Sequence, residues 1–444
     1  MTRTYFGTDG VRGRVGEHPL TAEFALRLAG AAAKALAPAG GTVLIGKDTR
    51  MSGYMLESAL EAGFAAAGVD VLLTGPIPTP AVAYLTKKLS CEFGIVISAS
   101  HNAFEDNGIK FFDKSGGKLS DETETRIESL LEQPALTLGS ERLGRVHRID
   151  NARSAYQRFC SASIAPGIDL ANFKVVVDCA HGAAYKVGPR ILADLGAEVI
   201  PIGCSPNGRN INLNCGSTSP ELLQHTVLGA NADVGIALDG DADRLVMVDD
   251  RGQVVDGDQL LYILAKAWHD QGLLPGPVVG TVLSNLGLEQ ALQHDGIQFL
   301  RARVGDRYVL EALQQSGGVL GGETSGHLLC LDHTTTGDAL VAALRVLSVM
   351  KKTGQTLAEL AAPMQKYPQA TANVQLRGRI DLDQSAPIKA ALAAVEERLA
   401  NQGRVVLRAS GTEPVIRVMV EGRDENLIRT LSRELAESVA AAAA

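Results

Sequence analysis

Residues 174–202 read KVVVDCAHGAAYKVGPRILADLGAEVIPI and contain one complete structural unit. An apolar run at 174–179 is followed by a Gly-containing loop, an amphipathic segment that extends to about Leu195, and a second apolar run at 197–202. This order predicts a strand, a loop, a helix and a second parallel strand, joined by a right-handed crossover. The stretch therefore favours an α/β fold built around parallel strands.

One similar unit precedes this stretch and another follows it. Three such units across roughly 250 residues predict three related α/β domains in tandem. The first has strand 41–46 (GTVLIG), loop KDTRMSG, helix 54–67 and strand 69–73, and the last has strand 277–283 (PVVGTVL), loop SNLG, a helix to about 294 and strand 297–300.

The last 75 residues or so have a different pattern, with the order strand, helix, strand, strand, helix, which is typical of a small α+β domain. We expect domain boundaries near residues 150, 255 and 367, giving domains at 1–150, 151–255, 256–367 and 368–444. The expected C-terminal elements are strand 371–376, helix 387–399, strands 404–407 and 415–420, and helix 426–440.

Composition excludes several classes of protein. The chain has 444 residues, 45% apolar and 21% charged, with a net charge of −8. Its Lys and Arg residues are scattered, so a nucleic-acid partner is not expected. No apolar run reaches about 18 residues, and the N-terminus has no signal-peptide pattern, so we expect no membrane association and a cytoplasmic location. The six cysteines have no paired spacing, which favours reduced thiols over a disulfide or metal role.

A polar loop follows the buried strand at 93–97. Ser98, Ser100 and Asn102 alternate there, and His101 stands beside Ser100. Ligands gather at the carboxyl ends of strands in open α/β sheets, so Ser100 is a candidate nucleophile or phosphate acceptor. Taken alone, the pattern favours a turn capped by Ser100 and Asn102 over a nucleophile.

A second loop, 232–244 (ADVGIALDGDADR), places Asp239, Asp241 and Asp243 directly after an apolar strand. Three carboxylates so close together repel one another unless a hard cation lies between them. An EF-hand is excluded because the sixth loop position is Arg244 and not Gly. We therefore favour a Mg²⁺ site over a solvated acidic turn, with Arg244 available for an additional anion.

A third loop, 321–327 (GGETSGH), offers Glu323 and Ser325 as hydrogen-bonding partners for vicinal sugar hydroxyls, with His327 to titrate or donate. Considered alone, it is also a typical Gly-rich turn. By contrast, 41–47 matches the G-x-x-x-x-G-K pattern but continues with Asp48, so no phosphate loop is expected there.

The fourth loop, 408–417 (RASGTEPVIR), is rich in hydrogen-bond donors. Arg side chains match phosphate oxygens in bidentate fashion, and Gly lets backbone amides approach an anion. We favour a phosphate-binding loop over a hairpin turn with surface arginines. Its candidate ligands are Arg408, Ser410, Gly411, Thr412 and Arg417.

In combination and order, these loops resemble the signatures of the α-D-phosphohexomutase superfamily across essentially the whole chain. The opening FGTDGVRG and the run VGDRYV at 304–309 are most similar to the bacterial branch that acts on glucosamine phosphates. The glucose and mannose phosphate branch is the alternative. The motifs are Phe6–Gly13 (FGTDGVRG), Ser98–Ala103 (SASHNA), Asp239–Arg244 (DGDADR), Gly322–His327 (GETSGH) and Arg408–Pro414 (RASGTEP).

The resemblance implies three α/β domains with mixed, mostly parallel sheets and a smaller C-terminal domain around a central cleft. It also implies an isomerase of amino-sugar metabolism that supplies peptidoglycan precursors. Such an enzyme interconverts glucosamine 6-phosphate and glucosamine 1-phosphate through a phosphoserine and a sugar 1,6-bisphosphate, which also acts as activator. The expected partner is a small hexosamine phosphate, and a homodimer is expected.

Residue roles follow from the same resemblance. Ser100 matches the phosphoserine, and its phosphate would bind Mg²⁺ together with Asp239, Asp241 and Asp243. Four groups would surround the transferred phosphoryl, and either Lys110 or His101 would be the base. The four groups around the phosphoryl are Arg12, His101, Lys110 and Arg244. The residues that would bind the sugar are Glu323, Ser325 and His327. The residues that would bind the other phosphate are Arg408, Ser410, Gly411, Thr412 and Arg417.

Overall fold

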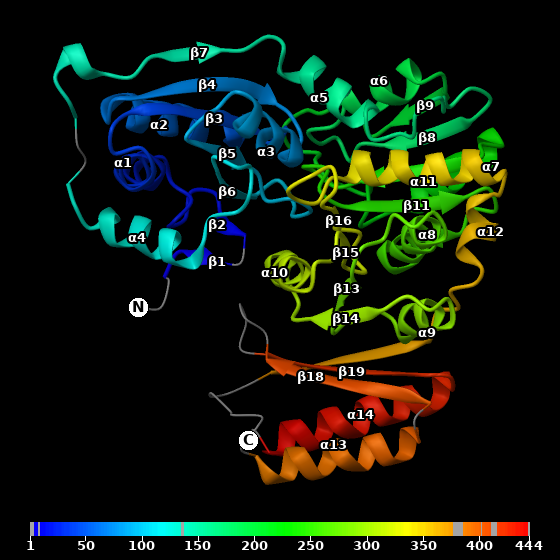
Figure 1. Cartoon of the computed structure of the whole chain (residues 1–444). Coiled ribbons are helices and arrows are strands. Elements are labelled where there is room, and N and C mark those ends of the chain that lie inside the picture. The colour runs from blue at the N-terminus through cyan, green and yellow to red at the C-terminus, as the bar shows by residue number, and fades with distance from the viewer. Residues whose placement is uncertain are drawn as a thin grey trace.

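The computed structural model describes residues 4–7, 9–134, 137–375, 385–400, 402–409 and 415–442. Within these residues the strands form sheets of seven, five, four and three strands. Figure 1 shows the first sheet and its helices beside the second and third, with the fourth sheet below them. None of the described helices combines the length and apolar character that a membrane span requires.

The first sheet has the order β1-β2-β6-β5-β3-β4-β7. β3, β4, β5 and β7 run parallel, whereas β5–β6, β6–β2 and β2–β1 pair antiparallel. Every residue of β5 is buried, as expected for a strand with both faces covered. The elements are β1 (Phe6–Gly7), β2 (Gly10–Arg14), α1 (Ala22–Leu36), β3 (Gly41–Lys47), α2 (Ser52–Ala66), β4 (Val69–Pro76), α3 (Thr79–Lys88), β5 (Phe93–Ile97), β6 (Asp106–Asp113), α4 (Asp121–Leu131) and β7 (Val146–Arg148).

The second sheet has the order β12-β11-β10-β8-β9. β9, β8 and β10 are parallel, and β11 and β12 are antiparallel additions at one edge. The elements are α5 (Ala152–Ser161), β8 (Lys174–Asp178), α6 (Val187–Asp194), β9 (Glu198–Ile202), α7 (Glu221–Ala230), β10 (Val234–Leu238), β11 (Leu245–Asp249) and β12 (Val254–Val255).

The third sheet repeats this arrangement in the order β14-β13-β15-β16, with only β16 antiparallel. Helix α11 contacts α5, α8 and β11, so one large apolar core is shared by the second and third sheets. The elements are α8 (Gly257–Asp270), β13 (Val278–Thr281), α9 (Leu286–His294), β14 (Phe299–Ala302), α10 (Asp306–Ser316), β15 (Leu320–Gly322), β16 (Leu328–Cys330), α11 (Ala339–Thr353) and α12 (Leu357–Ala361).

In each α/β sheet a parallel strand is followed by an antiparallel partner, and the resulting hairpins β5–β6, β10–β11 and β15–β16 occupy corresponding positions. The loops of these hairpins are the segments 98–105, 239–244 and 323–327. The three sequence motifs thus occupy equivalent positions in three related domains.

The fourth sheet, β17-β19-β18, is antiparallel and has its own apolar core against α13 and α14. Arg404 on β18 joins it to the third domain by donating to the carbonyls of Val282 and Ser284. Its elements are β17 (Gln369–Gln375), α13 (Ala386–Leu399), β18 (Gly403–Ala409), β19 (Val415–Gly422) and α14 (Glu425–Ala442).

The expected fold class is confirmed: mixed, mostly parallel α/β sheets with a smaller C-terminal α+β domain. The predicted β14 begins two residues too early, because the amide of Ile297 still donates to the carbonyl of Leu292 at 2.9 Å and closes the end of α9. The boundaries near 150, 255 and 367 remain predictions. We propose all three, and the boundary near 150 is supported by β7, which ends at Arg148 and still pairs with β4 of the first sheet.

Candidate active site

Ser100 and Asp239 come together from two different domains. Ser100 follows β5, is 1% exposed and has a φ of 52°. Its Oγ donates to Asp239 Oδ2 at 2.5 Å. The ring of His101 lies beside it, with Nδ1 3.4 Å from Ser100 Oγ. The hydroxyl is therefore held at a carboxylate, away from bulk solvent.

The acidic loop brings Asp239, Asp241 and Asp243 to one point. One oxygen of each carboxylate lies within 4.8 Å of the others, and all three residues are buried. Asp241 Oδ1 and Asp243 Oδ1 are buried without a hydrogen-bond partner among the described residues. Burial, followed by the charges of Asp243 and Asp241, raises the pKa of Asp239. Crowded carboxylates with unused oxygens fit a hard divalent cation such as Mg²⁺.

Lys110, on β6, supplies positive charge from the first domain. Its Nζ lies 2.8 Å from Asp241 Oδ2, 3.0 Å from Asp9 Oδ2 and 3.4 Å from Asp243 Oδ2. Burial lowers the pKa of Lys110, but these three carboxylates outweigh burial and leave its pKa raised. Lys110 is therefore a cation in this arrangement.

His101 differs from Lys110 in its ionisation. Burial lowers the pKa of His101 to about 4, and the nearby charges of Arg244 and Arg12 act in the same direction. The imidazole is therefore neutral near pH 7. Arg12 itself pairs with Asp9 at 2.5 Å.

Arg50 and Asn212 hold the Ser100 loop from behind. The Arg50 guanidinium, which is 0% exposed, donates to the carbonyls of Ser100 at 3.1 Å, Asn102 at 2.8 Å and also Ala103. Asn212 Nδ2 donates to the carbonyls of Ser100 at 2.8 Å and Asn102 at 3.0 Å. These bonds fix the left-handed backbone at Ser100, a conformation that costs a non-Gly residue energy.

Thr79, the first residue of α3, connects the first domain to the acidic loop. Its hydroxyl donates to Asp241 Oδ2 at 2.6 Å, and its amide donates to the Asp241 carbonyl at 2.9 Å. Thr79, Arg50 and Asn212 were not predicted from the sequence. For Arg50 the signal was present, because the charged run KDTR directly follows a buried strand.

The third hairpin closes the site from the other side. Glu323 Oε1 accepts from the amide of Gly305 at 3.0 Å. His327 lies between two carboxylates, with Nδ1 3.7 Å from Asp243 Oδ2 and Nε2 3.4 Å from Asp306 Oδ2. Burial lowers the pKa of His327, but the Asp243 carboxylate outweighs it and raises that pKa to about 9.

A cleft of about 470 Å³ opens above these groups. Its walls include residues of all three α/β domains, among them Arg12, Asp243, Arg244, Glu323 and His327. Ser325 is exposed beside them. The position and polarity of the cleft suit a small anionic sugar.

Arg408 and Arg417 are directly opposite each other on β18 and β19. Burial, followed by the charge of Arg417, lowers the pKa of Arg408, while Glu323 of the third domain acts in the opposite direction. The predicted ligands Ser410, Gly411 and Thr412 lie outside the described residues. The two arginines thus place positive charge on the side of the fourth domain that faces the third hairpin.

Family models of phosphoglucomutase/phosphomannomutase match the chain in four parts. The alpha/beta/alpha domains I, II and III match residues 3–137, 155–252 and 256–367, and the C-terminal domain matches residues 371–438. Among curated relatives, proteins named phosphoglucosamine mutase from Nitrosococcus oceani and Alcanivorax borkumensis are 55% and 56% identical over 441 and 440 residues. These alignments cover 99% of this chain and 98% and 99% of the relatives.

Solved structures share the fold. A phosphoglucomutase/phosphomannomutase family protein from Burkholderia thailandensis has a TM-score of 0.81 at 22% identity, covering 98% of this chain and 97% of its own. Aspergillus fumigatus N-acetylphosphoglucosamine mutase, in complex with GlcNAc-6P and magnesium, has a TM-score of 0.66 at 20% identity, covering 82% and 93%. With four family domains matched in order over most of its length, the chain belongs to the phosphoglucomutase/phosphomannomutase family.

Proposed function

We propose that this chain is a phosphoglucosamine mutase, which interconverts glucosamine 6-phosphate and glucosamine 1-phosphate. One observation carries the proposal: the Ser100 hydroxyl lies 2.5 Å from a carboxylate of a buried aspartate triad that fits a divalent cation. More than half of the chain is identical to relatives that carry this name. The sugar 1,6-bisphosphate activator and the homodimer remain predictions.

In the proposed reaction, a phosphoryl group on Ser100 passes to the free hydroxyl of the sugar phosphate. The bond between phosphorus and Ser100 Oγ breaks, a bond from the sugar oxygen to phosphorus forms, the sugar hydroxyl loses its proton and the serine oxygen gains one. The bisphosphate then returns its other phosphoryl group to Ser100. Such transfers depend mainly on positioning and on stabilising the charge of the phosphoryl oxygens.

The cationic groups of the site meet that requirement. Arg12, Lys110 and Arg244 place three positive charges around Ser100 and the aspartates. Asp239, Asp241 and Asp243, together with the Ser100 phosphate, would hold Mg²⁺, which neutralises charge on the phosphoryl oxygens when bound.

Two side chains can transfer protons: His101, which adjoins Ser100, and Lys110, which contacts Asp241 and Asp243. His101 is neutral and can accept a proton, whereas Lys110 is charged and can donate one. A phosphate on Ser100 adds negative charge beside the imidazole, which raises the pKa of His101 and makes it a better acceptor. We therefore assign the base to His101 and the acid to Lys110.

The fourth domain accounts for the two orientations of the bisphosphate. Whichever phosphate is not reacting needs one fixed binding site, and the Arg408–Arg417 pair, with the loop between them, offers paired guanidinium groups for it. Glu323 would accept hydrogen bonds from sugar hydroxyls at the bottom of the cleft.

The test is Ser100→Ala, assayed with glucosamine 6-phosphate and a trace of glucosamine 1,6-bisphosphate. We expect turnover to be lost, while the melting temperature is retained. Incubation of wild type with the bisphosphate should add one phosphoryl group to the intact mass, and the variant should show no addition. The matched control is the exposed Ser129→Ala, which should behave as wild type.

Substantial mutase activity in Ser100→Ala would reject the phosphoserine. Parallel assays with glucose and mannose 6-phosphates test the alternative, a phosphoglucomutase/phosphomannomutase. Higher kcat/KM for either of these sugars would overturn the assignment to glucosamine.

A further inference from the structure

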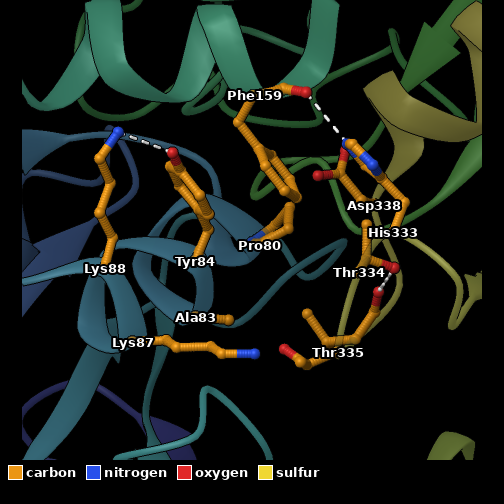
Figure 2. A pocket seen from close by; sticks show the side chains of 11 residues that line it. Pro80, Ala83, Tyr84, Lys87, Lys88, Phe159, His333, Thr334, Thr335 and Asp338 are labelled. Carbon is orange, nitrogen blue, oxygen red and sulfur yellow. Dashed lines mark hydrogen bonds between the residues drawn. The ribbon is translucent and has the colours of Figure 1, made fainter. Parts of the chain in front are cut away.

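A second cavity lies where the three α/β domains meet, away from the cleft. It has a volume of about 410 Å³, within the usual size range of small-molecule sites. Its walls come from α3 of the first domain, α5 of the second and the loop after β16 in the third (Figure 2). None of the groups assigned to the mutase reaction lines it.

The walls of this junction cavity are flat and aromatic. The Tyr84 and Phe159 rings are stacked with their centroids 4.1 Å apart and their planes at 22°. The His333 ring stacks on Phe159 at 4.4 Å and 20°. Pro80 and Ala83 complete an apolar surface beside them. Because the three rings already stack on one another, their edges form a preformed surface on which a planar ring can pack edge to face without rearranging the walls.

The opening of the cavity carries positive charge. Figure 2 shows the Lys87 side chain extending along the cavity, with its Nζ pointing toward Thr335. Lys87 is exposed, and its ammonium has no hydrogen-bond or ion-pair partner in the part of the chain that the structure describes. Lys88 Nζ donates to the Tyr84 hydroxyl at 2.8 Å. Lys87 therefore favours an anionic group at its end of the cavity, whereas Lys88 is bonded to Tyr84.

The polar groups deeper in the cavity do not compete for these lysines. Both carboxylate oxygens of Asp338 accept from the Tyr156 hydroxyl, at 3.0 and 2.9 Å. The Thr335 hydroxyl donates to the carbonyl of Gly116 at 2.6 Å. His333 Nε2 lies 3.0 Å from the Phe159 carbonyl, which can only accept, so Nε2 carries the proton and Nδ1 is left as an acceptor.

We propose that the junction cavity is a binding site for a small molecule in which a planar ring carries a phosphate or carboxylate group. The ring packs on the edge of the Tyr84–Phe159–His333 stack, and the anionic group pairs with Lys87. This site is additional to the proposed mutase activity and does not depend on it.

The site is connected to the catalytic centre by two short segments. Pro80 lines the cavity, and the preceding Thr79 bonds to Asp241. In the loop from the third domain, Gly337 packs so closely on His327 that a Cβ there would lie 2.5 Å from the imidazole. A bound molecule therefore touches segments that position groups of both the acidic loop and the sugar loop.

The test is calorimetric titration of the full chain, with glucosamine 6-phosphate at saturation to occupy the cleft. The probes are phenyl phosphate, benzoate and adenosine 5′-monophosphate, with inorganic phosphate as the anion that lacks a ring. We expect at least one ring-bearing anion to bind more tightly than inorganic phosphate. The probe that binds best distinguishes a nucleotide from a simple aryl phosphate or carboxylate.

Variants test whether that binding occurs in the cavity. Lys87→Gln should weaken it about tenfold, since one charge-assisted hydrogen bond is lost. Lys87→Arg should restore most of it, and Ala83→Leu should block the space for the ring. Lys114→Gln, at another exposed lysine, is the matched control and should bind as wild type.

The proposal is overturned if no ring-bearing anion binds, or if inorganic phosphate binds equally well. It is also overturned if Lys87→Gln binds like wild type. Because Lys87 is exposed, that variant should fold even if Ala83→Leu does not, and the melting temperature of each variant checks this.

Discussion

Asp241 is the aspartate most closely tied to the first domain. Its Oδ2 accepts from Thr79 and Lys110, while its Oδ1 is buried without a partner in the described part of the chain. We predict that Asp241→Asn weakens Mg²⁺ binding at least about tenfold, because it removes one of three charges from the site. The measurement is the Mg²⁺ dependence of mutase activity, together with direct metal titration.

Asp233→Asn is a matched control, because Asp233 is exposed at the other end of the same strand, β10. It should leave the metal titration unchanged. An Asp241→Asn variant with wild-type Mg²⁺ affinity would remove this residue from the metal site.

A different prediction concerns Asn212, whose side-chain hydrogen bonds within the described residues go to the backbone of the Ser100 loop. Asn212→Ala removes two hydrogen bonds that fix the carbonyls of Ser100 and Asn102. We expect kcat to fall about tenfold with KM nearly unchanged, because the nucleophile is less well oriented while the sugar contacts remain. Steady-state kinetics with glucosamine 6-phosphate would show this, and a rise in KM alone would contradict the positioning role.

Residue types with distinctive chemistry were predictable from sequence. Three alternating aspartates, and a serine at the end of a buried strand, point to a metal and a nucleophile from local pattern alone. Asn212 carries no such signal, because one asparagine in a long loop resembles any other. Its role arises only when the second domain packs against the first.

At the scale of elements, Asp338 caps helix α11 from inside the protein. Its Oδ1 accepts from the amide of Val341 at 3.0 Å, and burial raises the pKa of Asp338 from about 3.8 to about 6. At low pH the carboxyl is protonated in both the folded and unfolded chain. Between about pH 3.8 and about pH 6 the carboxyl ionises in the unfolded chain but stays protonated in the folded chain, and above about pH 6 the folded chain carries a buried charge. The free energy of unfolding is therefore highest below pH 3.8 and falls as pH rises to about 6.

We therefore predict that Asp338→Asn gains stability relative to wild type as pH increases. Asn retains an acceptor for the cap, and a pKa difference of about two corresponds to at most about 3 kcal/mol. Denaturant unfolding of both chains near pH 4.5 and pH 7.5 measures the free energy of unfolding. A difference between the two chains that does not grow with pH would contradict the prediction.

Most elements were predictable because their periodicity and end signals agree. The repeated strand, loop and helix units gave β3, β8 and β13 within a few residues of their observed bounds. The antiparallel strands β6, β11 and β16 were harder to place, because a buried antiparallel strand and a buried parallel strand have the same apolar composition. Their pairing places the three motif loops, so the equivalent positions of these loops emerge only from the sheet order.

For the whole molecule, Arg404 provides a contact between the third and fourth domains. Arg404 pairs with Glu421, which is 0% exposed, and reaches across to the carbonyls of Val282 and Ser284. We predict that Arg404→Gln loosens this contact and raises KM several-fold, because Arg408 and Arg417 are then held less firmly at the cleft.

Hydrogen exchange provides the structural measurement for this prediction. Amides of β18 and β19 should exchange faster in Arg404→Gln, while those of β3 and β5 should not change. Arg433→Gln, on α14, is the control and should leave both exchange and KM unaltered. Faster exchange throughout the chain would indicate general destabilisation instead.

The relative placement of the domains was the least predictable feature. The run VGDRYV served only as a point of resemblance, yet its charged pair joins two domains. Asp306 pairs with Lys118, and Arg307 lies against Asp121 and Glu124 on α4. Sequence periodicity describes what one element buries, but it carries no information on which distant carboxylate an arginine will meet.

The distance along the chain between Ser100 and Asp239 has a consequence for biosynthesis. A ribosome that has completed the first sheet has produced the serine but none of the three aspartates, and the third hairpin emerges later still. A growing polypeptide therefore cannot acquire its phosphate by the proposed chemistry, and fragments left by premature termination before Asp239 are inert toward cellular sugar phosphates. Activity begins only when translation is nearly finished.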